Sequence, residues 1–146
     1  MVSREFVLGG RAVFTVDNGK GTHYTYKVRA KESKFRAGQT VFFVSINRDL
    51  GNTGRHFAYI GMVLPNGTIR LTGKSTVGED AVEFKVAAWA LAMIWTGGTL
   101  PDGYAIHHEG TCGRCGKALT HPESIQSGFG PDCIKLMPRF ASRLAA

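Results

Sequence analysis

Residues 107–133 read HHEGTCGRCGKALTHPESIQSGFGPDC and contain every cysteine of the chain, with the spacing Cys112-x2-Cys115-x17-Cys133. Three cysteines cannot all pair within one chain, and a C-x2-C turn directs two thiolates at one ion. The segment also has few large apolar side chains, Leu119, Ile125 and Phe129 being nearly all of them. Burial alone cannot fold such a segment, so the pattern predicts a metal site.

Structural zinc takes four protein ligands, and three cysteines leave one position. His107, His108 and His121 all lie close enough in sequence to fill it. Pro131 is a favourable first residue for a helix, which would place Cys133 in a first turn where the helix dipole stabilises a thiolate. A knuckle followed by a ligand at a helix start is typical of the treble-clef arrangement. We therefore expect one Zn²⁺ in a closed site, with the three histidines as alternatives for the fourth ligand.

Two motifs point weakly towards catalysis. Zinc deaminases combine H-x-E with P-C-x-x-C, and His107 to Glu109 followed by Cys112 contains part of this pattern. Here only two residues separate Glu109 from Cys112, and no proline precedes Cys112. Residues 73–76 read GKST, as in a phosphate loop, but the glycine that the pattern requires is replaced by Thr68. We expect the protein not to be an enzyme.

Alternation of apolar and polar residues predicts antiparallel strands in the N-terminal half. Lys27 and Arg29 alternate with Tyr26 and Val28, which gives one strand a basic outer side. A segment rich in β-branched and aromatic residues predicts a central strand. The five predicted strands cover 12–16, 22–29, 40–46 and two segments that flank the turn at Pro65-Asn66-Gly67.

Residues 79–95 predict one long helix, with Glu79 and Asp80 at its start and Gly97 and Gly98 after its end. Apolar residues occupy so much of its circumference that the helix should be buried. The predicted fold class is α+β. An N-terminal antiparallel sheet, curved or barrel-like, packs on the one long buried helix in residues 1–100, and a zinc-binding module follows in residues 101–146.

The formal net charge is +7, which suits a polyanionic partner. The apolar run from Val86 to Trp95 is far shorter than the roughly 20 residues of a spanning helix, so we expect no membrane contact and a cytoplasmic location with reduced thiols. The candidate nucleic-acid-binding residues are Lys27, Arg29, Arg114, Lys117, Lys135, Arg139 and Arg143.

The cysteine segment resembles a small zinc-finger-like domain of bacteriophage and bacterial proteins, the family of unknown function DUF6011. The family pattern, H-E-G-x-C-G-x-C followed by S-I-x-x-G-x-G-P-x-C, falls on His108, Cys112, Cys115 and Cys133. His121 falls at a position that the pattern leaves open. The resemblance implies His108 as the fourth ligand and a phage-like origin, in which case the location is the host cytoplasm.

Two functions remain for such a chain. Nucleic-acid binding is favoured by the charge and by strands that carry aromatic and basic residues, because bases stack on rings while cations follow the backbone. The alternative is a phage factor that engages or inhibits a host or defence protein. The sequence leaves the oligomeric state and the choice between DNA and RNA open. The aromatic residues considered for stacking are Tyr24, Tyr26, Phe42, Phe43, Phe57 and Tyr59.

Overall fold

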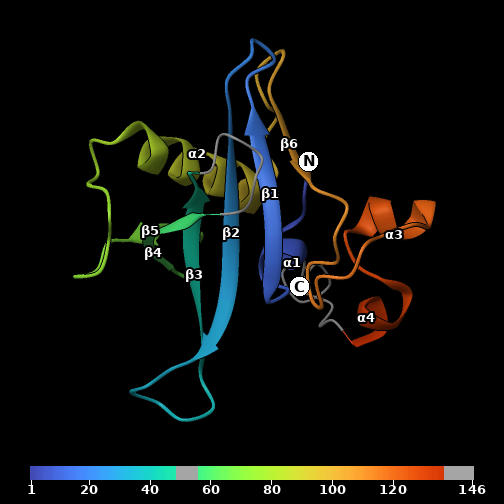
Figure 1. Cartoon of the computed structure of the whole chain (residues 1–146), viewed down its shortest axis with the longest axis horizontal. Helices are drawn as coiled ribbons and strands as arrows, with labels where there is room; N and C mark the ends of the chain where they lie inside the picture. The colour runs from blue at the N-terminus through green and yellow to red at the C-terminus, as the bar shows by residue number, and fades with distance from the viewer. Residues whose placement is uncertain (49–55, 137–146) are drawn as a thin grey trace.

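The computed structural model describes residues 1–48 and 56–136 of the chain. They form one antiparallel sheet with the order β5-β4-β3-β2-β1-β6, a helix across one face and the cysteine segment at the β1–β6 side (Figure 1). The strands are β1 Arg11–Asp17, β2 His23–Glu32, β3 Thr40–Asn47, β4 Phe57–Val63, β5 Ile69–Arg70 and β6 Ala105–His108. The helices are α1 Arg4–Val7, α2 Val82–Thr96, α3 Pro122–Ser127 and α4 Pro131–Leu136.

The predicted antiparallel sheet is confirmed, and β1 to β5 correspond to the five predicted strands. A sixth strand, β6, was not predicted; it comes after α2 and pairs with β1, so that Val16 faces Ile106. The prediction of a barrel-like sheet is wrong. The described strands run in an open order from β5 to β6, because β6 adds to the free edge of β1 and leaves β5 unjoined to it.

Helix α2 begins at Val82, three residues after the predicted start, and ends as predicted at Gly97, which adopts a left-handed φ of 67°. The prediction of one long buried helix is wrong as well. Val82 is 52% exposed, and the fully buried side chains lie on one side only. Two of them are alanines, which let the helix axis approach the sheet closely. The buried residues of α2 are Ala87, Ala90, Leu91 and Ile94.

Within the described residues, no helix has the length and hydropathy to cross a membrane.

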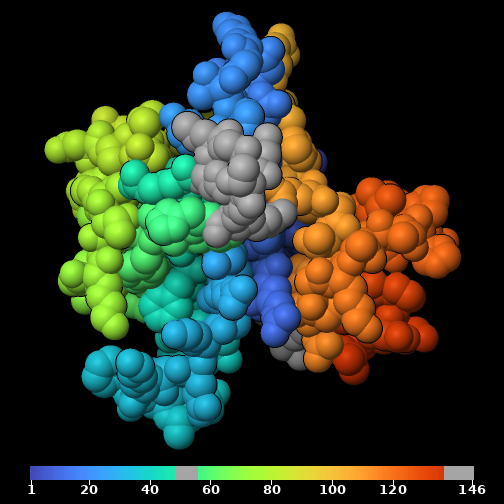
Figure 2. All heavy atoms as spheres, viewed as in Figure 1, coloured from blue at the N-terminus to red at the C-terminus, as the bar shows by residue number. Residues whose placement is uncertain are grey.

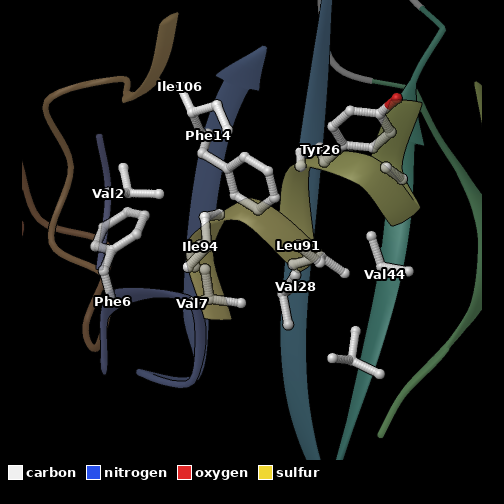
Figure 3. Packing of buried hydrophobic residues seen from close by; sticks show 14 of the residues in the cluster. Val2, Phe6, Val7, Phe14, Tyr26, Val28, Val44, Leu91, Ile94 and Ile106 are labelled. Atoms are coloured by element: carbon white, nitrogen blue, oxygen red, sulfur yellow. The ribbon is translucent and has the colours of Figure 1, made fainter. Parts of the chain in front are cut away.

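The core lies between α2 and the sheet (Figure 3). Phe14 and Tyr26 pack with ring centroids 5.8 Å apart, and the Tyr26 hydroxyl donates a hydrogen bond of 2.9 Å to the carbonyl of Glu83. Burial is the main reason why the pKa of Tyr26 is raised. The same core continues without interruption into Phe6 of α1 and Cys112 of the cysteine segment. The sheet and the cysteine segment are therefore parts of one packed interior.

Candidate metal centre and basic face

The three cysteine side chains meet at the side of the sheet that β6 forms. Cys112 and Cys115 lie in the turn after β6, and Cys133 is the third residue of α4. Their Sγ atoms all lie within 4.8 Å of one another, and none of the three is in a disulfide. Cys112 is fully buried and Cys133 is 7% exposed. Three converging thiols at this separation can hold a metal ion.

Backbone amides surround the sulfur of Cys112. The N–H groups of Arg114, Cys115 and Gly130 point at Cys112 Sγ from 3.4, 3.5 and 3.4 Å. Gly116 makes this turn possible, because its φ of 80° lies in the left-handed region. Donors aimed at a sulfur stabilise its thiolate form, which is the form that binds metals.

The electrostatic environment differs between two of the thiols. Burial raises the pKa of Cys112, but the surrounding N–H donors outweigh it and lower the pKa to about 7. Burial raises the pKa of Cys133, and the Arg114 guanidinium, 3.7 Å from its Sγ, acts in the opposite direction. The donor set is soft and favours a thiolate-binding metal over magnesium or calcium.

The histidines lie outside this group of three thiols. His108 uses both ring nitrogens elsewhere: Nδ1 accepts a 2.9 Å hydrogen bond from the N–H of Gly110, and Nε2 donates to the carbonyl of Ile125. His107 is exposed on β6, and exposed His121 occupies the N-cap position of α3. The structure thus brings together three of the four predicted ligands, and the fourth stays a prediction.

We expect His108→Ala to weaken metal binding and His121→Ala to leave it unchanged. The resemblance described above implies a ligand at His108, and the structure adds that the His108 ring connects β6 to α3 through a hydrogen bond with Ile125. Chelator competition on the two zinc-loaded variants measures the effect, and cobalt substitution reports imidazole coordination. Loss of metal in His121→Ala alone would reassign the ligand. Full retention in both variants would mean that the thiolates hold the ion without either imidazole.

Phe6 of α1 packs against the cysteine segment. A Cβ atom added to Gly113 would lie 2.6 Å from Cδ2 of Phe6, and one added to Gly128 would lie 2.5 Å from it. Gly113 also accepts a 2.8 Å backbone hydrogen bond from Arg11. Two glycines of the family pattern therefore leave space for a ring from the other end of the chain. Sequence reasoning missed Phe6, and the only signal was that these glycines recur in the pattern.

The candidate basic residues fall into two groups. Lys27 and Arg29 lie on the sheet face opposite α2, called here the outer face, while Arg114 and Lys117 are exposed on the knuckle. Arg11, which sequence reasoning missed, links them. It pairs with Arg29 across β1 and β2, and its Cδ would lie 3.8 Å from a Cβ atom on Gly116. We call Arg11, Lys27, Arg29, Arg114 and Lys117 the basic strip. In Figure 2 the blue surface of β1 and β2 borders the orange knuckle.

The remaining candidates lie at the C-terminal end. Lys135 is exposed in the last turn of α4. Arg139 and Arg143 fall outside the described residues. Lys135 is therefore the one member of this group that the described residues place, on α4 outside the sheet.

The six candidate aromatic residues are divided between the two faces of the sheet. Cross-strand partners point to the same side, and the register assigns Tyr24, Tyr26 and Phe42 to the face covered by α2. The outer face carries Phe43, Phe57 and Tyr59. Half of the predicted stacking surface is therefore core.

Comparison with known proteins identifies one segment. Residues 106–137 match the family of unknown function DUF6011. The match contains all three clustered cysteines and His108, and it confirms the similarity of this segment to that family. Neither a curated protein nor a solved structure matches the chain.

Proposed function

We propose that the chain is a non-enzymatic zinc-binding protein of phage-like origin that binds nucleic acid, mainly by electrostatic attraction. The observation that supports this most directly is the basic strip, which combines residues from the sheet with residues from the knuckle. Arg11 and Arg29 are cross-strand neighbours although like charges at this spacing repel each other. A surface that concentrates positive charge in this way is suited to a polyanion.

The proposed metal is Zn²⁺, held by Cys112, Cys115, Cys133 and His108 in a treble-clef-like module. Coordination by His108 would require one of its ring nitrogens to exchange its present hydrogen bond for the ion. Thiolate ligands select zinc, copper(I) or iron–sulfur clusters, and a C-x2-C knuckle with a helix-borne third cysteine suits tetrahedral zinc. Four protein ligands would leave no coordinated water to activate. This is the reason for proposing a structural rather than a catalytic centre. Reduced thiols fit a cytoplasmic protein.

Salt dependence tests the proposal. Charge reversal of Arg11, Arg29 and Lys117 to glutamate should weaken binding and reduce the slope of log affinity against log salt by about one for each phosphate that the protein no longer neutralises. Reversal of Lys135, Arg139 and Arg143 changes the net charge equally and should also weaken binding, so the two variants compare the C-terminal group with the basic strip.

The measurement is a salt titration with random single- and double-stranded DNA and RNA. A larger loss of affinity in the C-terminal variant would place the interface there instead of on the basic strip. If the unmodified, zinc-loaded protein binds none of these nucleic acids at low salt, the proposal is wrong.

An interaction with a host or defence protein is the second candidate function. A groove of about 460 Å³ lies between the N-terminal residues and the module, and its lining includes Phe6, Ile125 and Ile134. Ile125 is 47% exposed and Ile134 is 45% exposed. Exposed apolar side chains grouped beside a groove are typical of protein contacts. Binding to a purified partner that resists salt but is abolished in Ile134→Asp would favour this function.

A further inference from the structure

We propose that the outer face binds single-stranded nucleic acid, with bases stacked on Phe43, Phe57 and Tyr59 and phosphates held by the arginines beside them. This inference rests on the proposed nucleic-acid-binding function and specifies the strand form and the contact residues. It follows from how the register arranges rings and cations on one face.

One row of side chains crosses five strands of the outer face. Arg11 pairs with Arg29, Arg29 with Phe43, Phe43 with Met62, and Met62 with Arg70. Neighbouring strands lie about 4.8 Å apart, so the row is about 19 Å long. Arginines occupy both ends, and an aromatic ring and a thioether occupy the middle. Such a row can place bases at its centre and phosphates at its ends.

The next row adds a second ring and a fourth cation. Lys27 pairs with Ser45, and Ser45 with Tyr59. The rings of Phe43 and Tyr59 meet edge to face with centroids 5.8 Å apart. Lys27 places its Nζ 4.2 Å from the ring centroid of Phe57. These contacts fix the orientation of the rings in advance, which lowers the entropic cost of stacking a base on them.

Basic side chains outnumber carboxylates on this face. Glu109, directly after β6, lines a pocket together with Thr15 and Thr25. By the pairing register, one carboxylate, Asp17, lies among the outer-face residues of the described strands. It occupies the end of β1 opposite Arg11, and Arg11 adjoins the knuckle. A phosphate backbone is therefore attracted towards the knuckle end of the sheet. The basic outer-face strand residues are Arg11, Lys27, Arg29, Lys31 and Arg70.

The partly exposed rings favour binding of a single strand over binding of a duplex. In a duplex the base faces are stacked on one another, and proteins reach base edges by inserting a helix or a ribbon into a groove. Unpaired bases expose a π-face to any aromatic side chain, irrespective of sequence. A sheet face that presents partly exposed rings between cations therefore favours unpaired bases.

Fluorescence anisotropy with a labelled oligothymidylate and a duplex of equal length tests the inference on the full, zinc-loaded chain. Phe43→Leu and Tyr59→Leu should each weaken single-strand binding about tenfold, because stacking contributes strongly for each base, and should barely affect the duplex. Tyr104→Leu is the matched control. Tyr104 is 42% exposed and packs edge to face on Trp89 of α2, away from the outer face.

Phe43→Tyr should bind the single strand as tightly as the unmodified protein, because it keeps a ring, and thermal unfolding and metal content verify that each variant is folded. Equal binding of the two strand forms, or ring variants that behave like Tyr104→Leu, would overturn the inference. In that case a continued effect of Arg29→Glu would leave the proposed nucleic-acid function standing. If the unmodified protein binds no nucleic acid, both the single-strand inference and the proposed nucleic-acid-binding function are wrong.

Discussion

Cys133→Ser is expected to release the metal ion and to unfold the knuckle, α3 and α4. Cys133 supplies one of three converging thiols from the first turn of α4. Binding of a structural zinc contributes on the order of 10 kcal/mol of apparent free energy, far more than the few apolar side chains of this segment supply. The unmodified protein should carry about one zinc per chain.

Metal analysis and amide hydrogen exchange of the Cys133→Ser variant test this prediction. Protection should vanish from 109–136 and persist in β2, β3 and α2, because β2 and β3 pair with each other along their length and Tyr26 of β2 bonds to α2. α1 and β6 should lose part of their protection, because Phe6 lies against Gly113 and Gly128 and His108 bonds to Ile125 of α3. Chelator-treated unmodified protein is the control and should show the same pattern. Protected amides in α3 and α4 without metal would contradict a metal-dependent fold.

The strand pattern in the sequence was sufficient for most of the sheet, and its failures have physical reasons. In a long strand such as β2, the alternation of apolar and polar residues shows which side is buried and which is exposed. β6 has four residues, of which only Ile106 is buried. So short a segment shows no detectable alternation of apolar and polar residues. The burial of α2 was overestimated because apolar composition does not show which side meets the sheet. Ala87 and Ala90 make that contact, while the larger Val82 is exposed.

The candidate site shows a similar limit. Spacing alone identified the three cysteines, because metal ligation requires residue types that have few other reasons to cluster. It could not identify Arg11 or Phe6, which meet the knuckle from about a hundred residues away in the chain. Nor could it decide which of the neighbouring residues Phe42 and Phe43 faces α2 until the register was known. Contacts between distant segments depend on topology, which no local pattern contains.

Phe6→Ala is expected to destabilise the protein by about 3–5 kcal/mol, the usual effect of removing a buried phenyl ring. Phe6 is 1% exposed, and its ring centroid lies 5.6 Å from that of His108 and 6.1 Å from that of Phe129. Phe35→Ala is the matched control. Phe35 is 96% exposed in the turn between β2 and β3, so its removal should change the free energy of unfolding by less than about 0.5 kcal/mol.

Denaturant unfolding of the zinc-loaded variants measures both changes, and a double-mutant cycle with Gly128→Ala isolates the contact. Gly128→Ala alone combines the strain of a φ of 81° with a Cβ atom 2.5 Å from the Phe6 ring. Phe6→Ala removes the ring and with it the collision, so the double variant should be more stable than the sum of the two changes predicts. Additive changes, or a Phe6→Ala variant as stable as Phe35→Ala, would show that α1 does not hold the cysteine segment in place.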